Sequence, residues 1–288
     1  MRFAYFPGCK IPHYVPHYGH SAKAVLALLG VELVDLEFGC CGYPMSHLYY
    51  KSSVYSSIRN LALSQAQGLD LATPCKCCYG QFMRTLDVME RVPELKRDLT
   101  AQLAEEGLAY PSQIRVRHIE QVLHDDIGLE AIKPRIRRRF RLLRAAALYG
   151  CHAIRPSNVT RFENPHGPHL IDDLINLTGA ESINWAGRLS CCGAPIREHN
   201  PELSLAIITK RLTECREAKA DVLVIGCPYS QMQAERAWAQ PRPSADRQLI
   251  HGAILYPQLL GLTLGLTPQD LALAKNTPDA EYLLSFLE

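Results

Sequence analysis

Short apolar runs of strand length alternate along the chain with longer segments of helical periodicity. The runs occupy residues 3–7, 31–36, 69–73, 145–149 and 221–225, and Gly, Pro or Asp residues bound them. Between the runs, residues 20–29, 51–67 and 201–219 carry apolar side chains at three- and four-residue intervals. Strands that alternate with helices in this way predict an α/β fold with mainly parallel sheets.

The cysteines follow this pattern and repeat it. In each half of the chain, one cysteine comes after an apolar run, a Cys-Cys-Gly sequence comes later, and a further cysteine follows the next run. The interval from the Cys-Cys pair to that further cysteine is 34 residues in the first half and 35 in the second. The first set is Cys9, Cys40, Cys41, Cys75 and Cys78, and the second is Cys151, Cys191, Cys192 and Cys227, with Ser230 at the last position.

The residues around the cysteines also repeat, which distinguishes a duplicated unit from a chance spacing. Residues 40–44 read Cys-Cys-Gly-Tyr-Pro, and residues 191–195 read Cys-Cys-Gly-Ala-Pro. The sequence therefore predicts two pseudo-symmetric, Rossmann-like cysteine-rich half-domains, over residues 1–132 and 145–288, joined by a basic linker over 133–144. The cysteines of both sets would then lie just past strands, where open α/β sheets usually bind ligands.

The charge and hydropathy of the chain argue against a nucleic-acid-binding protein and against a membrane-spanning one. With 31 basic and 29 acidic residues, the chain lacks the bulk positive charge of a nucleic-acid-binding protein. The basic linker is expected to be a solvated segment, with a docking patch for an acidic partner subunit or a nucleic-acid contact as alternatives. The apolar stretch 253–266 is interrupted by Pro257 and Gln258 and is shorter than the roughly 18 residues of a membrane span. Because the first residues also lack a secretory signal, we expect a cytoplasmic protein without a membrane span.

Eleven cysteines in a cytoplasmic chain indicate metal or redox chemistry, because the reducing cytosol disfavours disulfides. Converging thiolates would repel one another without a cation, and thiolate sulfur suits iron-sulfur clusters and zinc. A zinc site closes at four ligands, so the five cysteines of the first set favour a cluster. Cys77 and Cys215 fall outside the repeat and are expected to be ordinary buried side chains.

The duplicated Cys-Cys-Gly pattern is similar to that of the B-subunit family of heterodisulfide reductase. The likeness covers nearly the whole chain and includes residues 5–9, 116–123, 149–151 and 259–262. In that family each complete five-cysteine set binds a non-cubane 4Fe-4S cluster. The resemblance therefore implies such a cluster in the first half, held by Cys9, Cys40, Cys41, Cys75 and Cys78.

The second half departs from the family's pattern at Ser230, whose hydroxyl is harder and far less acidic than a thiol. Ser230 could be a ligand, the fifth position could be open to a substrate sulfur, or the four cysteines could hold a simpler cluster. Those four cysteines are Cys151, Cys191, Cys192 and Cys227. We expect a second iron-sulfur cluster here, with zinc as the alternative, because some relatives carry zinc in a degenerate half.

The resemblance implies a redox subunit that transfers electrons to or from a disulfide, a thiol or another sulfur substrate, as in the heterodisulfide-reductase-like complexes of sulfur oxidisers. The chain shows no flavin or nicotinamide fingerprint. By the resemblance, its partners would be a ferredoxin-like C-type subunit and a flavin-bearing A-type subunit. The alternatives are a non-catalytic relay or scaffold with a degenerate second site, and a subunit of a succinate-, lactate- or glycolate-oxidising complex.

In addition to the cysteines, three side chains are candidates for a role in catalysis or substrate binding. His13 and His152 lie near the first cysteine of each half, where an imidazole could stabilise a thiolate or supply a proton. Arg155 could bind an anionic part of a substrate. The alternative for all three is an ordinary surface or core role.

Overall fold

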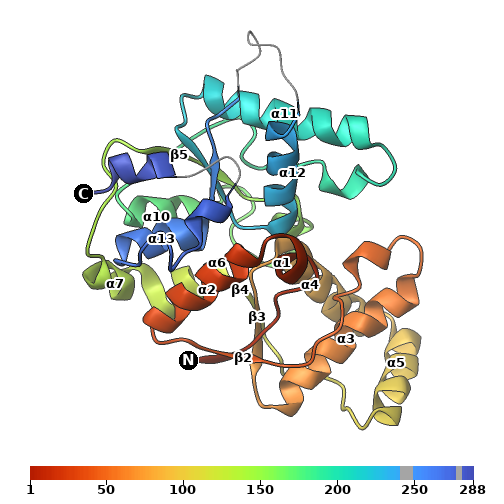
Figure 1. The fold of residues 1–288 in the computed structure, drawn as a ribbon. Coiled ribbons are helices and arrows are strands. Elements are labelled where there is room, and N and C mark those ends of the chain that lie inside the picture. Colours follow the sequence, from red (N-terminus) through yellow and green to blue (C-terminus); the bar gives the residue numbers. More distant parts are fainter. Residues whose placement is uncertain (241–248, 277–280) are drawn as a thin grey trace.

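The computed structural model describes residues 1–240, 249–276 and 281–288 and contains two four-stranded sheets, one in each half of the chain. Figure 1 shows the first half in red to yellow and the second in green to blue. The first sheet has the order β2-β1-β3-β4 and the second the order β6-β5-β7-β8, and the pairing is parallel throughout both. The predicted α/β class, with two Rossmann-like halves, is confirmed.

The strands are short. Those of the first sheet are β1 (Arg2–Tyr5), β2 (Glu32–Asp35), β3 (Asp70–Thr73) and β4 (Val116–His118). Those of the second are β5 (Arg144–Leu148), β6 (Glu181–Ile183), β7 (Val222–Ile225) and β8 (Ala253–Leu255).

Helices connect the strands in both halves. The first half contains α1 (Lys10–Tyr14), α2 (Pro16–Leu28), η1 (Tyr43–Met45), α3 (Tyr50–Ala66), α4 (Lys76–Arg91), α5 (Pro93–Glu105), α6 (Ile119–Gln121), η2 (Val122–Gly128), α7 (Leu129–Ile132) and η3 (Lys133–Arg135). The second contains α8 (Cys151–Ile154), α9 (Ser157–Thr160), α10 (Leu170–Leu177), η4 (Ala194–Ile196), α11 (Pro201–Glu217), α12 (Pro228–Trp238), α13 (Tyr256–Thr263), η6 (Leu273–Lys275) and η7 (Glu281–Phe286).

The apolar runs locate five of the strands, and the three predicted helices correspond to α2, α3 and α11. Strands β4, β6 and β8 were not predicted. Each has three residues, too few for a period of two to stand out. They are strands because of their neighbours: Val116 pairs with Leu71 of β3, for example. Tertiary pairing therefore defines these edge strands.

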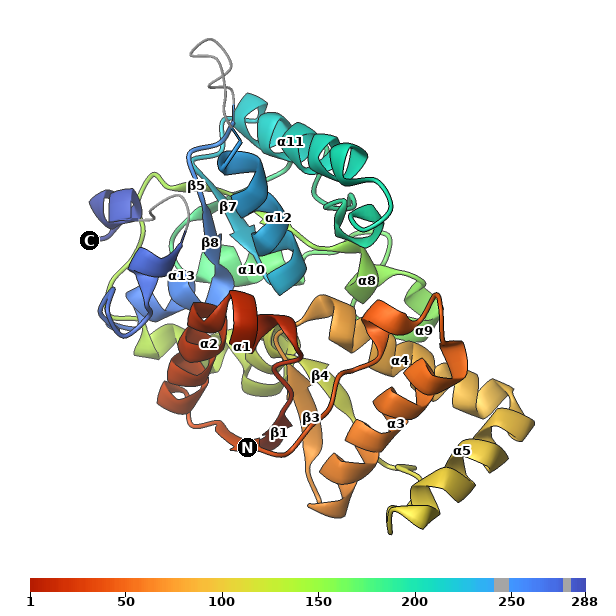
Figure 2. The same ribbon diagram turned by 45° about the vertical axis from the view of Figure 1, so that its right-hand side comes forward.

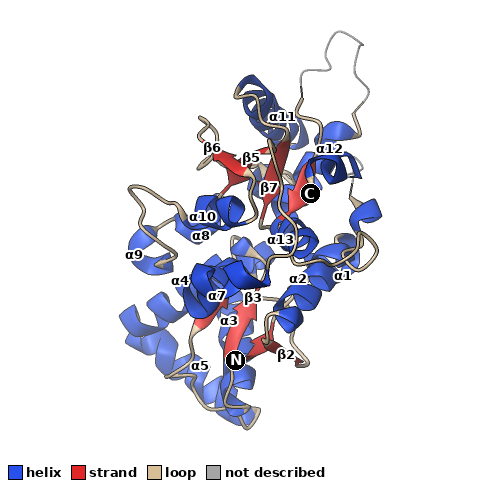
Figure 3. Ribbon diagram, turned by 90° about the vertical axis from the view of Figure 1, so that its left-hand side faces the viewer, coloured by secondary structure: helices blue, strands red, loops and turns tan. Residues whose placement is uncertain are grey.

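The two halves pack against each other through helices that lie between the sheets. Figures 2 and 3 show α2 of the first half beside α13 of the second, with α10 next to α13. The approach is close, because a Cβ built on Gly261 of α13 would lie 3.1 Å from the Val25 side chain. Buried residues of both halves belong to one hydrophobic cluster. This packing holds the two sheets in one arrangement.

The basic segment 133–144 is attached to the second half. The backbone amides of Arg137 and Arg138 donate to the carbonyl of Thr263, and the amide of Arg141 donates to the carbonyl of Phe286. Phe140 pairs with Leu287 in an isolated antiparallel bridge. The segment is therefore an ordered strap along the chain's last residues, and the predicted domain limits stay a prediction.

A span of the membrane would need a long apolar helix. Within residues 1–240, 249–276 and 281–288, no helix combines the length and the apolar character that crossing a bilayer requires.

Candidate functional site

Four cysteines follow the carboxyl ends of the central strands. Cys9 follows β1, and Cys75 follows β3; in the second half Cys151 follows β5, and Cys227 follows β7. Cys75 and Cys227 follow strands of different sheets, and yet their sulfur atoms lie within 4.8 Å of each other. The carboxyl edges of the two sheets therefore meet at the cysteines.

The first Cys-Cys-Gly sequence forms a turn that is held from α3 and α4. Gly42 has φ of 84°, and its amide donates to the Cys40 sulfur at 3.4 Å. The Ser53 hydroxyl donates to the Gly42 carbonyl at 2.9 Å, and the Gln81 amide donates to the Ser53 hydroxyl at 3.0 Å. These bonds fix where the two adjacent thiols point.

The second Cys-Cys-Gly turn repeats this arrangement atom by atom. Gly193 has φ of 82°, and its amide donates to the Cys191 sulfur at 3.3 Å. The Ser204 hydroxyl donates to the Gly193 carbonyl at 2.9 Å, and the Gln233 amide donates to the Ser204 hydroxyl at 2.6 Å. The duplication seen in the cysteines thus extends to the serine and glutamine that support them, neither of which the sequence pattern singled out.

The substitution Gly42→Ala is expected to disrupt the first turn, because a Cβ there would lie 2.4 Å from the Ser53 carbonyl oxygen. Gly30→Ala is the matched control: Gly30 has nearly the same φ of 83°, with nothing within 4 Å of the added Cβ. Both variants should lose about 1–2 kcal/mol from the left-handed backbone. Only Gly42→Ala should also lose metal from the first site, measured as iron per chain. Equal iron in the two variants would contradict the role assigned to this turn.

The thiols of the first set form a continuous chain of contacts. Side-chain hydrogen bonds link Cys9 to Cys40, Cys40 to Cys41, Cys41 to Cys78 and Cys78 to Cys75. The bond to Cys40 raises the pKa of Cys9, and the bonds to Cys41 and Cys9 lower the pKa of Cys40. Adjacent thiols therefore share protons instead of ionising together, as expected for a set that needs a cation to become fully anionic.

The second set is similar but ends on a hydroxyl. Hydrogen bonds link Cys151 to Cys191, Cys191 to Cys192, and Cys192 to the Ser230 side chain. Ser230 is buried in the first turn of α12, at the position that Cys78 has in α4. Cys227 precedes α12 as Cys75 precedes α4, and burial raises the pKa of Cys227 to about 12.

A third group of thiols lies at the junction of the two sets. The sulfur atoms of Cys75, Cys77 and Cys227 are all within 4.8 Å of one another. Nδ1 of His152 lies 3.1 Å from the Cys77 sulfur, and its Nε2 lies 3.2 Å from the Tyr43 hydroxyl. Burial lowers the pKa of His152 to about 4. Cys77, expected to be an ordinary buried side chain, instead contacts both halves of the site.

A buried ion pair underlies this junction. Lys76 Nζ lies 3.0 Å from a Glu120 carboxylate oxygen, and each side chain is 1% exposed. A Cβ built on Gly226 would lie 1.7 Å from Glu120 Oε1 and 2.9 Å from Lys76 Nζ, so the pair presses against the backbone just before Cys227. The first half therefore inserts a positive and a negative charge beneath the second set.

The donors suit an iron-sulfur cluster better than a single ion. Neighbouring thiols in sequence, such as Cys40 and Cys41, belong to one contact chain, and the first set consists of five sulfur donors. Soft thiolates are the ligands of such clusters, and zinc uses four at most. The second set offers four thiols and one hydroxyl.

Comparisons with known proteins agree with this duplication. Residues 3–83 and 145–234 match the CCG cysteine-rich domain family. The chain is 30% identical over 293 residues to the B subunit of the ferredoxin/F(420)H(2)-dependent CoB-CoM heterodisulfide reductase of Methanosarcina acetivorans, and covers 97% of it. The chain belongs to the B-subunit family of heterodisulfide reductase.

Relatives of this B-subunit family come from more than one kind of reductase. The chain is 28% identical to the B subunit of the ferredoxin:CoB-CoM heterodisulfide reductase of Methanosarcina mazei, covering 97% of it. It is 26% identical to the 8-methylmenaquinol:fumarate reductase membrane anchor subunit of Wolinella succinogenes, covering 98% of it. The fold resembles a hypothetical protein from Helicobacter pylori, with a TM-score of 0.77 and 18% identity over 98% of this chain; the chain spans 52% of that structure.

In this member of the B-subunit family, pockets open between the two Cys-Cys-Gly turns. Tyr43 and Pro195, one from each turn, line two pockets in common, and His152 and Pro195 line a third that reaches Cys77, Cys151 and Cys227. Three basic side chains, Lys10, Arg84 and Arg197, also line the first two pockets, together with His47 and the acidic Glu198. The pocket at the junction cysteines and the two pockets with basic side chains share Pro195 in their linings.

The other candidates lie elsewhere or have local partners. His13 is exposed on α1. The Arg155 guanidinium donates to the carbonyl of Leu189 at 3.1 Å, which fixes a loop of the second half. Cys215 is fully buried in the second half's own core, as expected. Of the three candidates for chemistry, His152 is the one whose polar contacts within the described residues include a cysteine of the junction.

Proposed function

We propose that this chain is the iron-sulfur redox subunit of a heterodisulfide-reductase-type complex. The observation that carries the proposal is the meeting of two thiol sets at Cys75 and Cys227. The first set, Cys9, Cys40, Cys41, Cys75 and Cys78, would hold a non-cubane 4Fe-4S cluster. Such a cluster supplies one-electron chemistry, and the chain's own residues hold it and control what reaches it.

The second set would hold another iron-sulfur cluster through Cys151, Cys191, Cys192 and Cys227. Ser230 lies at the end of that set, hydrogen-bonded to Cys192. Because a hydroxyl is a weaker ligand for iron than a thiolate, this position can exchange more readily than its counterpart Cys78. The second cluster is therefore the one at which we expect a substrate sulfur to bind.

The substrate would be a disulfide, a thiol or another sulfur compound that carries negative charge. Lys10, Arg84 and Arg197 on the walls of the pockets support an anionic substrate. His152 lies where it can exchange a proton with a sulfur that is reduced at the junction. Two adjacent one-electron centres suit the cleavage of one disulfide bond, which takes two electrons.

Electrons would reach the chain from other subunits. By analogy with the B-subunit family, whose members belong to multisubunit reductases, a ferredoxin-like C-type subunit and a flavin-bearing A-type subunit are the proposed partners. The cytoplasmic location expected from the sequence stays a prediction.

One observation favours a second function. The relative from Wolinella succinogenes is named as a subunit of a fumarate reductase, and it matches nearly the whole chain. In such a complex this chain would relay electrons without a sulfur substrate. Reduction of a disulfide by the cluster-loaded protein with an artificial electron donor would favour the first function, and electron uptake without disulfide cleavage would favour the relay.

The substitution Ser230→Cys should give the second set five thiols and change its electron spin resonance spectrum toward that of the first. Cys78→Ser is the reciprocal control, because it gives the first set the donors of the second. Both variants would be purified without oxygen and compared by iron content and spectrum. If Ser230→Cys changes neither, Ser230 is not the point at which the two sites differ.

A further inference from the structure

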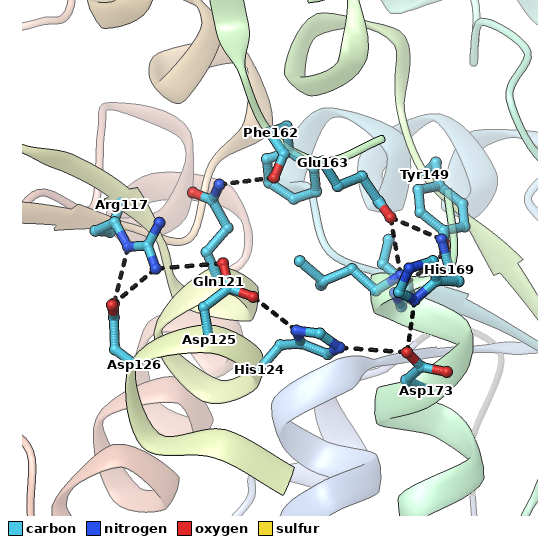
Figure 4. Close-up of polar contacts among 12 residues, drawn as sticks. Arg117, Gln121, His124, Asp125, Asp126, Tyr149, Phe162, Glu163, His169 and Asp173 are labelled. Atoms are coloured by element: carbon cyan, nitrogen blue, oxygen red, sulfur yellow. Dashed lines mark hydrogen bonds and ion pairs between the residues drawn. The ribbon is translucent and has the colours of Figure 1, made fainter. Parts of the chain in front are cut away.

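A group of histidine and aspartate side chains joins the two halves away from the junction thiols. His124 lies in η2, a π-helical segment of the first half. His169 immediately precedes α10 of the second half, and Asp173 lies in the first turn of α10. One potential ligand atom from each lies within 4.8 Å of the other two. Figure 4 shows His124 between Asp125 and Asp173, with His169 beside Asp173.

His124 faces a carboxylate at each ring nitrogen. Its Nδ1 lies 2.7 Å from Asp125 Oδ1, and its Nε2 lies 3.3 Å from Asp173 Oδ2. A neutral imidazole carries a single ring proton and can donate to only one of them. If Nδ1 donates to Asp125, the lone pair of Nε2 faces the negative charge of Asp173, and a metal ion between those two atoms would turn this unfavourable contact into a favourable one.

Neighbouring residues form hydrogen bonds with the histidines and so orient them, as residues around the ligands of a metal site usually do. Metal-binding histidines usually donate their other ring N–H to a carboxylate, which is the relation of His124 to Asp125. Arg117 holds Asp125 at 3.3 Å. Glu163 accepts from the backbone amide of His169 at 2.7 Å and so fixes the residue that starts α10.

The distance from His124 to Asp173 and the types of donor fit a divalent transition ion. Ligands at zinc distances lie about 3.3 Å apart in a tetrahedron, close to the 3.3 Å from His124 Nε2 to Asp173 Oδ2. His169 Nδ1 is hydrogen-bonded to Asp173 at 2.6 Å, a contact that a metal would replace. Two imidazoles and one carboxylate suit Zn²⁺ and its neighbours in the transition series.

We infer that His124, His169 and Asp173 form a divalent metal site that bridges the two halves, with water completing the coordination. The side chains of His124 and His169 are 19% and 63% exposed, so the site is open to ions on one side. The ion would tie η2 to α10 and so help to keep the two carboxyl edges together. This inference does not depend on the iron-sulfur proposal, because no cysteine belongs to the group.

The test uses the full chain, purified without oxygen with its iron loaded and then freed of other metals by a chelator. Co²⁺ and Zn²⁺ are added to the wild-type protein and to His124→Gln and Asp173→Asn. The control is His166→Gln, an exposed histidine of the same loop. We expect the wild type and the control to bind one more ion than the two site variants, and Zn²⁺ to raise the melting temperature only in the former pair.

The cobalt spectrum identifies the ligands. Nitrogen and oxygen ligands give weak visible bands, whereas cysteine ligands add intense charge-transfer bands in the near ultraviolet. His169→Asn is a third variant for the case that the others fold poorly, because its side chain is largely exposed. Equal binding by all variants, sulfur-type bands as the only cobalt signal, or a melting temperature that does not respond to Zn²⁺ would overturn the inference.

Discussion

Replacing Cys41 by alanine is expected to remove the first cluster entirely, with loss of its spin resonance signal and of its share of the iron. Cys41 is 2% exposed and occupies the middle of the first thiol chain, between Cys40 and Cys78. Its removal separates the donors that follow β1 and β2 from those at the start of α4. Iron and sulfide per chain and the spectrum of the reduced protein are the measurements.

Cys215→Ala is the matched control for this experiment. Both substitutions remove one buried sulfur atom, so the cost of the small cavity is similar. Cys215 lies in the core of the second half, and the charged groups that act on its thiol are Glu214 and Arg211. We expect Cys215→Ala to keep its iron, and a Cys41→Ala protein with wild-type iron and spectrum would disprove the proposed ligand set.

The substitution Lys76→Met should destabilise the protein by about 3–5 kcal/mol, because it leaves the Glu120 carboxylate buried without its partner. Methionine keeps much of the length and volume of the lysine side chain, so most of the loss is electrostatic. Lys23→Met is the control: Lys23 pairs with Asp35 at the surface, where such a pair contributes at most about 1 kcal/mol. Anaerobic denaturant unfolding compares the variants.

The pH dependence separates lost charge pairing from lost packing. Burial raises the pKa of Glu120, and Lys76 lowers it, so removing Lys76 raises the pKa further. When the pKa of a carboxyl is higher in the folded state than in the unfolded state, the folded protein loses stability as the pH rises above the ordinary pKa of that carboxyl. The destabilisation by Lys76→Met should therefore grow from acidic to neutral pH, and Lys76→Met/Glu120→Gln should remove this growth. A loss that is constant with pH would point to packing instead.

The junction brings cysteines of both halves of this chain to one place. Cys75 and Cys227 belong to different sets, and their buried sulfur atoms lie within 4.8 Å of each other. Centres held at these two residues would be neighbours, and electron exchange between them would need no motion of either half. The buried pair of Lys76 and Glu120, both from the first half, lies against the backbone of Gly226, just before Cys227 of the second set.

The strands that show an apolar pattern in the sequence were predictable from it. The strands β1, β3, β5 and β7 are central in their sheets, and apart from the first residue of three of them their residues are buried, so the sequence reveals them as short apolar segments. The edge strands β4, β6 and β8 have three residues each and are defined by pairing with those central strands. These edge strands are therefore recognised by the central strand that each pairs with and not by their own amino-acid composition.

The roles of site residues that lie outside the repeated cysteine pattern were not predictable from the sequence. Cys77 has no counterpart in the second half, where Tyr229 occupies the equivalent place one residue before Ser230, so the repeat assigned it no role. Lys76 and Glu120 are 44 residues apart and resemble ordinary helix-surface charges in sequence. Only the packing of α4 and α6 against the second half shows that they are buried together.

The sequence by itself determined the duplicated α/β architecture and the positions of both cysteine sets, because strand periodicity and cysteine spacing are local and occur twice. Only the tertiary structure decided that the carboxyl edges of the two sheets meet, that Cys77 and His152 lie where they meet, and that His124 faces Asp173. Those relations depend on how α2, α10 and α13 pack between the sheets. Such contacts join residues far apart in the chain, and no local pattern encodes them.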